Sequence, residues 1–178
     1  MSTATAVASG AEGAGPAVEI DAVVGLRDLP VGKSTRKDFV AKLGEPAEVV
    51  KHGTYSFALE YKQGIRATYC QADKEERIRW VSVQAPFRAF VSGGPGGGKI
   101  VLGQSTMREA KSALGECQWS TSDKSLFWSC AFAQDGAGDL SFFVDRDLTV
   151  PHFPLDEARH IDRRVVKIQV SEKGAGCD

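Results

Sequence analysis

Two stretches of this chain share one pattern: VGKSTRKDFVAKLGEP at residues 31–46 and LGQSTMREAKSALGEC at residues 102–117. Aligned without a gap at an offset of 71 residues, they share a glycine, a Ser-Thr pair and a Leu-Gly-Glu triplet. Self-similarity of this kind is typical of a repeated structural unit. The pattern therefore predicts two copies of one unit within the 178 residues.

Each stretch is predicted to form a short helix of about ten residues with its own start and stop signals. Ser34 or Thr35 is the expected N-cap of the first helix, because a hydroxyl can accept a hydrogen bond from the first turn. Asp38 lies in that turn, where a negative charge interacts favourably with the helix dipole. Gly44 is expected to end the helix in a left-handed conformation, and Gly115 has the same place in the second copy.

The segments after each helix alternate between apolar and polar residues at the strand period. The same offset pairs YSFALEY (55–61) with LFWSCAF (126–132), and further strands follow in both copies: IRATYC (65–70), LSFFVD (140–145), IRWVSV (78–83) and VVKIQV (165–170). The second copy has an insertion at residues 149–164 before its last strand. We predict an α+β fold of two tandem helix–β–β–β units that form an antiparallel sheet with helices on one side.

Composition sets the expected boundaries of these units. Large apolar side chains are absent from the first residues, and a run of glycines separates the two copies. We expect a disordered N-terminal tail (1–17), a first unit (18–91), a Gly-rich linker (92–99), a second unit (100–173) and a loose C-terminal tail (174–178).

The stretch VGKST (31–35) resembles the end of a phosphate-binding loop, and GGPGGGK (93–99) resembles its beginning. Neither completes the G-x-x-x-x-G-K-[ST] motif. Arg27 stands where the first stretch needs its leading glycine, and Ile100 stands where the second needs a hydroxyl. In the second copy Gln104 stands at the position of Lys33. The glycine and the two hydroxyl residues recur without the lysine, and a helix start needs these residues whereas a phosphate-binding loop also needs the lysine. We expect no nucleotide to bind.

The bulk composition also limits the function classes. The net charge of −1 lacks the basic excess that nucleic-acid-binding proteins show. No apolar run approaches the roughly 18 residues of a membrane span. Nucleophile elbows and other local catalytic signatures are absent from the sequence. We therefore expect a protein that is not an enzyme and has no cofactor, no nucleic-acid partner and no membrane span.

One alternative function depends on the insertion at residues 149–164. His152, Asp156 and His160 lie there, and these residue types can bind a metal ion. Their eight-residue span within a proline-containing loop is a weak metal signal, and solvated loop side chains explain it more simply. The competing hypothesis is a small-molecule-binding, metal-binding or enzymatic domain that uses this insertion.

The strand face that points away from the helices is the main candidate site. If Val81 and Val83 pack with the helices, Trp80 lies on this opposite face. Its other expected members are Ser56, Ala58, Glu60, Arg66, Thr68, Phe127, Ser129, Ser141 and Phe143. Aromatic residues on such a face are either covered or used for binding. The insertion or the N-terminal tail covers them in one interpretation, and a partner protein contacts them in the other.

The arrangement resembles the β-lactamase inhibitor protein family, and its single unit resembles the small BamE/SmpA-type lipoproteins of outer-membrane assembly. The residues that carry the resemblance are the repeated G-[QK]-S-T stretches, LGEP (43–46), GEC (115–117) and WSC (128–130). The likeness extends over residues 25–170. In the first copy Pro46 and Leu59 stand where the second has cysteines.

The resemblance implies a Cys117–Cys130 disulfide, an oxidising compartment and a sheet face that binds another protein. The residues in the corresponding positions are Trp80, Phe127 and Phe143 on the face and the turn Asp135–Asp139 at its edge. Strand alternation places Arg66 on the same face as a further candidate. From spacing alone, Cys117 and Cys130 are close enough in sequence to form a local disulfide, and Cys70 and Cys177 have no obvious partners. The alternative is that all four are free thiols in a reducing compartment.

The leading hypothesis is therefore a non-catalytic protein-binding module that acts as an inhibitor, an immunity-type protein or an envelope-assembly factor. As a mature form without its signal segment, it would be periplasmic or secreted. As a full-length chain, it would be cytoplasmic, because its first residues form no secretory signal.

Overall fold

The computed structural model describes residues 17–23, 25–92, 97–121, 127–132, 138–145, 149 and 156–177. In these residues the protein is an α+β structure, mostly of strands, with two sheets and three short helices. The helices are α1 (Arg36–Leu43), α2 (Met107–Leu114) and α3 (Glu157–His160). None of the described helices is both long and apolar enough to cross a membrane.

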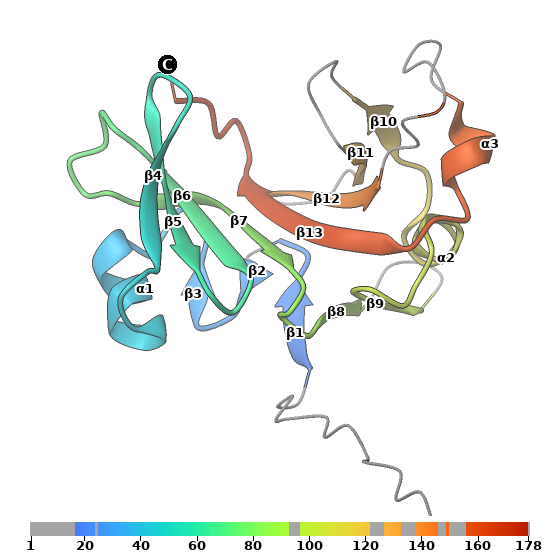
Figure 1. The fold of residues 1–178 in the computed structure, drawn as a ribbon, viewed down its shortest axis with the longest axis horizontal. Helices are drawn as coiled ribbons and strands as arrows, with labels where there is room; N and C mark the ends of the chain where they lie inside the picture. The colour runs from blue at the N-terminus through green and yellow to red at the C-terminus, as the bar shows by residue number, and fades with distance from the viewer. Residues whose placement is uncertain are drawn as a thin grey trace, which may run out of the picture.

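The large sheet has eight strands in the order β10-β11-β12-β13-β7-β6-β5-β4, and every neighbouring pair is antiparallel. The central pair, β7 and β13, joins the two halves of the chain (Figure 1). The strand bounds are β4 (Glu48–His52), β5 (Ser56–Tyr61), β6 (Ile65–Cys70), β7 (Ile78–Gln84), β10 (Gln118–Ser120), β11 (Phe127–Phe132), β12 (Gly138–Asp145) and β13 (Val165–Glu172).

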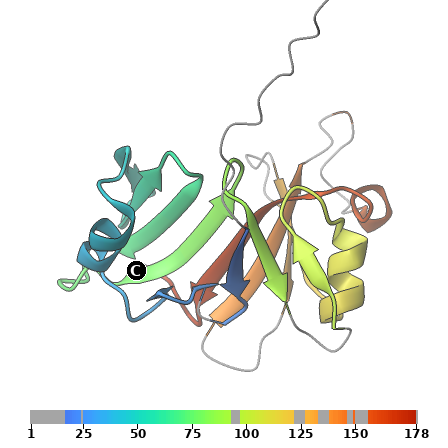
Figure 2. The same cartoon turned by 90° about the horizontal axis from the view of Figure 1, so that it is seen from below.

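The small sheet has five strands in the order β3-β2-β1-β8-β9 and packs across the large sheet on the same side as α1 and α2 (Figure 2). Its β1 and β8 pair in parallel, and its other pairs are antiparallel. The strand bounds are β1 (Val18–Asp21), β2 (Gly25–Leu26), β3 (Leu29–Pro30), β8 (Ala89–Ser92) and β9 (Lys99–Val101). In the part of the chain that the structure describes, the other side of the large sheet carries neither helices nor the small sheet, and we call it the open face.

Both long helices begin with the same hydrogen-bonded motif. The Thr35 side chain accepts a hydrogen bond from the Asp38 backbone N–H, and the Asp38 carboxylate accepts one from the Thr35 N–H. Thr106 and Glu109 form the matching capping box at α2. Of the two hydroxyls expected to cap the first helix, that of Thr35 forms the cap. The glycine that ends each helix has a positive φ, as expected, but an extended ψ in place of the left-handed helical one.

The shared glycine and serine attach each helix start to a central strand. The Gly32 N–H donates to the Ile78 carbonyl at 2.7 Å, and the Ile78 N–H donates to the Ser34 carbonyl at 2.8 Å. In the second half Val165, the first residue of β13, makes both matching bonds, to Gly103 at 2.8 Å and Ser105 at 2.9 Å. The backbone of VGKST therefore fixes the helix start to the sheet, and its lysine side chain is exposed.

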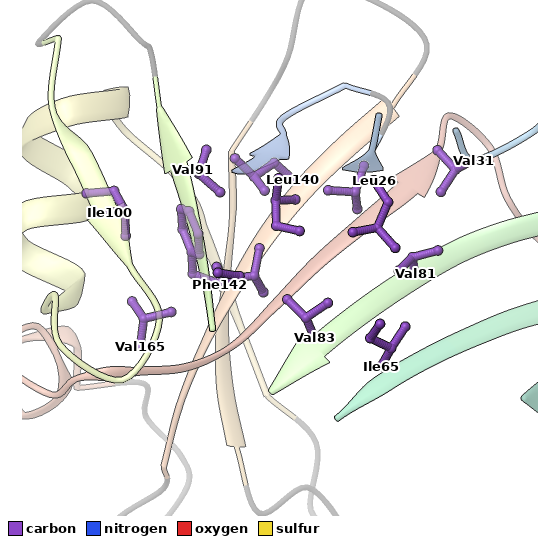
Figure 3. Close-up of a cluster of buried hydrophobic side chains, with 14 of the residues drawn as sticks. Leu26, Val31, Ile65, Val81, Val83, Val91, Ile100, Leu140, Phe142 and Val165 are labelled. Carbon is purple, nitrogen blue, oxygen red and sulfur yellow. The ribbon is translucent and has the colours of Figure 1, made fainter. Parts of the chain in front are cut away.

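The core lies between the two sheets. Figure 3 shows apolar side chains from both sheets pointing into one cluster. Val81, Val83, Leu140 and Phe142 come from the large sheet, and Val91 comes from the small one, each at most 3% exposed. Burying these aliphatic and aromatic side chains contributes about 1.5–3 kcal/mol for each. The large sheet therefore has one face that packs against a continuous core and one that does not.

Several parts of this architecture differ from the sequence-based prediction. The small sheet was not predicted. Residues 25–30, for which the sequence predicts no strand, form the β2–β3 hairpin and bury Leu26 and Leu29. A short strand, β4 or β10, follows each long helix before the predicted ones begin. Tyr55, the first residue of the predicted strand 55–61, precedes β5 and is 58% exposed. Ser92 and Lys99 lie opposite each other, so the Gly-rich linker connects two neighbouring antiparallel strands.

All four cysteines form disulfides, Cys117–Cys130 and Cys70–Cys177. The first is the pairing that the family resemblance implies. The second, for which spacing suggested no partner, bonds the C-terminal segment to the end of β6. That segment is therefore anchored, although the sequence suggested a loose tail. Two disulfides indicate an oxidising compartment, because cytosolic thiols are kept reduced.

Candidate functional site

The open face contains the aromatic residues that the sequence placed there. Residues opposite each other in antiparallel strands point to the same side of a sheet. Trp80 on β7 lies between Thr68 and Ser171, and Phe143 on β12 lies between Ser129 and Lys167. Phe127 contacts Phe143 edge to face, with ring centroids 6.4 Å apart. In Figure 1 the two ends of the large sheet curve toward this side, so the open face is concave.

A lysine lies against these rings. Lys167, in the middle of β13, places its Nζ 4.0 Å from the ring centroid of Phe143 and 5.7 Å from that of Phe127. Cation–π contacts of this kind contribute about 0.5–1 kcal/mol. Within the described residues, no carboxylate oxygen lies within 4.0 Å of this ammonium group. Lys167 is thus a half-buried cation with aromatic contacts and no described counter-ion.

A polar hollow of about 160 Å³ lies beside this lysine. Ser82 and Gln84 on β7 lie at its centre, because β7 runs between the strands that carry its charged residues. Arg66 lies opposite Ser82 on β6, and Lys167 lies opposite Gln84 on β13. Glu60 on β5 completes the charged lining. The hollow therefore has one cation on each side of its central strand.

The positive charges of this site affect one another. Burial, together with the nearby Arg66, holds the pKa of Lys167 below its ordinary value. Burial is also the main reason that the pKa of His52 is lowered, with Arg66 and Lys167 adding to the shift and Glu60 opposing it. Arg66 itself contacts Glu60 at 3.5 Å and the His52 Nδ1 at 3.1 Å. Of the two cations that line the hollow, only Arg66 has a described carboxylate beside it.

The remaining predicted site residues lie at the margins. Asp139 is exposed near the start of β12 and lines a second hollow on the open face, of about 450 Å³, together with Trp80. The C-terminal segment at Gly174–Gly176 forms one wall of that hollow. Asp135 lies outside the described residues. Part of the region around Trp80 is thus bordered by the C-terminal segment.

The alternative metal site is only partly within the described residues. His160 is fully buried, its ring stacks on Trp128 with centroids 3.8 Å apart, and its Nδ1 lies 3.0 Å from the Asp156 carbonyl oxygen. The Asp156 carboxylate pairs with Arg159 at 2.8 Å. His152 is outside the described part, in which no cluster of three potential ligands occurs. The described end of the insertion packs near α2, where Lys111 contacts Glu157 at 2.6 Å.

An apolar cavity of about 410 Å³ lies away from the open face. It opens between α1, the β2–β3 hairpin and β1, and Leu26, Leu43, Ile65 and Phe87 supply much of its apolar lining. Two ion pairs involve residues of its lining, Lys42–Asp28 at 2.8 Å and Arg27–Glu19 at 3.3 Å. Because these charges are already paired, the cavity has no unpaired polar group among them to orient a ligand.

Sequence reasoning missed Lys167 and His52. Lys167 interrupts the apolar run VVKIQV, and its position in the alternation places it on the same face as Phe143. Lys167 could therefore have been singled out from the sequence, because burying a lysine without a partner in a central strand costs free energy. The sequence could not show that Arg66 would face the same hollow from two strands away.

Comparisons with protein-family models and with curated proteins give no match. Among solved structures, the fold is similar to that of a DUF4309 family protein (YjgB) from Bacillus subtilis, with a TM-score of 0.53. The two share 16% sequence identity over 83% of this chain and 84% of the other. Likeness at this identity concerns the fold alone.

Proposed function

We propose that this protein is a non-catalytic protein-binding module whose open face contacts a partner protein. The observation that carries the proposal is the combination of Trp80, Phe127, Phe143 and Arg66 on one concave sheet face. Aromatic residues and arginine are the types enriched at the centres of protein interfaces. In alanine scans of known complexes, tryptophan, tyrosine and arginine are enriched among the few residues whose truncation weakens binding most.

The cysteines indicate where the protein acts. The two disulfides favour action outside the cytosol, in the periplasm or as a secreted protein. An inhibitor, an immunity-type protein or an envelope-assembly factor would each bind its partner through such a face. The disulfides support a rigid face, because one joins Cys117, the residue before β10, to Cys130 of β11, and the other holds the C-terminal segment beside the open face.

We also infer that the two halves of the protein are copies of one unit. The capping boxes, the hydrogen bonds from Gly32 and Gly103 to the central strands and the mirrored strand order around β7 and β13 support this inference. In this interpretation the open face is formed where the last strands of the two units pair. A face assembled from two units can be wide enough to bind another protein.

The test compares two triple variants in affinity capture from an envelope extract of the source organism. The first replaces Trp80, Phe127 and Phe143 by alanine. The matched control replaces the exposed apolar residues outside the open face, Val18, Val49 and Tyr55. Circular dichroism and thermal unfolding establish that both variants fold. We expect the first variant to lose the captured partner and the control to keep it, with at least a tenfold difference in Kd once the partner is purified. Equal capture by both variants would refute the proposal.

A further inference from the structure

The polar hollow of the open face has the features of a binding site for a single negative charge. Its long side chains approach from both sides of β7, Arg66 from β6 and Lys167 from β13. Between them, Ser82 and Gln84 can donate hydrogen bonds from a hydroxyl and an amide. The arginine fork matches the two oxygens of a carboxylate, and the lysine contributes a point charge.

We propose that this hollow binds the carboxylate of an aspartate or glutamate side chain presented by the partner protein. The inference rests on the proposed function of the open face and specifies the partner's chemistry. Lys167 has no described carboxylate within ion-pair distance, so an incoming carboxylate would supply its missing counter-ion. Phe143 and Phe127 lie beside it and would contact the apolar atoms that surround that carboxylate.

The charge of the site favours a monoanion. Lys167 and Arg66 carry one positive charge each, and Glu60 carries one negative charge, which leaves the lining with a net charge of about +1. A carboxylate matches this charge, whereas a phosphomonoester would bring up to two negative charges next to Glu60. The volume of about 160 Å³ exceeds the roughly 30 Å³ that a water molecule occupies in the liquid, so a carboxylate group with its methylene can enter.

The surroundings argue against a nucleic-acid strand as the occupant. By strand register, Glu48, Asp139 and Asp145 point to the same side of the sheet as the hollow, and all three are exposed. A chain of phosphates crossing the face would meet these carboxylates. A protein loop that carries one acidic residue among apolar ones meets the cations and the aromatic rings together.

The experiment titrates the full protein with defined probes and follows the Lys167 side chain by NMR. The first probe is the blocked peptide acetyl-Phe-Asp-Phe-amide, the second is its asparagine counterpart and the third is inorganic phosphate. We expect the aspartate peptide to shift the Lys167 signals saturably and to raise the pKa of that lysine, because a counter-ion favours its charged form. The asparagine peptide should bind at least tenfold more weakly, and phosphate more weakly than the aspartate peptide.

Variants establish where the peptide binds. Lys167→Met and Arg66→Gln should each weaken the aspartate peptide at least tenfold. Lys62→Met is the matched control, because Lys62 is exposed in the turn before β6 and outside the hollow, and it should leave the affinity unchanged. Equal binding of the two peptides, tighter binding of phosphate, or absence of any shift at Lys167 would each overturn the inference.

The capture and titration experiments distinguish a failure of the carboxylate inference from a failure of the proposed function. If the aromatic triple variant loses the captured partner while Lys167→Met and Arg66→Gln keep it with unchanged affinity, the face binds a protein and the carboxylate inference is wrong. If the aromatic triple variant keeps the partner, the proposed function is wrong, and the peptide titration still decides whether the hollow binds a carboxylate.

Discussion

Replacing Gly32, Gly64 and Gly103 individually by alanine tests how much the atoms around each glycine limit the stability of a variant with an added Cβ. All three glycines have a positive φ, of 75°, 88° and 77° respectively. A side chain in this conformation costs about 1–2 kcal/mol, and the lower entropy of the unfolded alanine variant offsets about 0.4–1 kcal/mol of it. At Gly103 an added Cβ would have no atom within 4 Å. Gly103→Ala should therefore cost only this net amount, about 1 kcal/mol.

The other two positions add steric contacts of different kinds. At Gly32 the Cβ would lie 2.9 Å from the Cδ of Glu172, a side chain that can move but would give up its 2.9 Å ion pair with Arg79. Such partly exposed pairs contribute up to about 1 kcal/mol, which makes the expected cost about 2 kcal/mol. At Gly64 the Cβ would overlap the backbone oxygen of Gln84, which cannot move without distorting the end of β7. Overpacking of about 1–3 kcal/mol then raises the cost to about 3 kcal/mol.

Urea unfolding followed by tryptophan fluorescence measures these differences, with a common slope used for all variants. The expected order of destabilisation is Gly103→Ala, then Gly32→Ala, then Gly64→Ala. In a Glu172→Ala background, Gly32→Ala should cost no more than Gly103→Ala, because the crowding side chain is gone. Equal costs at Gly32 and Gly103 in the natural background, or no coupling between Gly32 and Glu172, would refute the reasoning.

Three further predictions concern the disulfides, the pH dependence of stability and the pKa of His52. The bond at Cys70 closes a loop of 107 residues and the bond at Cys117 one of 13, so chain entropy predicts that Cys70→Ser costs about 4.7 kcal/mol and Cys117→Ser about 3 kcal/mol in thermal unfolding. A larger loss for Cys117→Ser would contradict that model. The pKa of His52 is lower in the folded state than in the unfolded state. Between the two pKa values the unfolded state therefore binds more protons. The free energy of unfolding should fall as the pH drops from about 6.5 through that window. NMR titration should show that Lys167→Met raises the pKa of His52 and that Glu60→Gln lowers it further. A shift in the opposite direction in either variant would contradict the effect assigned to that charge on His52.

The parts of the fold that could be predicted are those with a local cause. Thr35 and Thr106 cap helices because a hydroxyl and an acidic residue three positions later lie within one short segment. The alternation of apolar and polar residues around Trp80 and Phe143 determines on which side of the sheet each side chain lies. This does not depend on which strand is the neighbour. The small sheet has no such signal. Its β2 and β3 contain two residues each, too few for an alternating pattern.

The features that could not be predicted depend on residues that are distant in the sequence. Cys70 and Cys177 are 107 residues apart, and no local spacing indicates that the chain end returns to β6. The charged hollow needs β7 to lie between β6 and β13, since only this strand order places Arg66 and Lys167 on opposite sides of Ser82. Alternation alone assigns both cations to one face but says nothing of the distance between them. The aromatic residues of the open face are therefore a sequence-level prediction, whereas the preference for an acidic partner follows only from how the two halves pair.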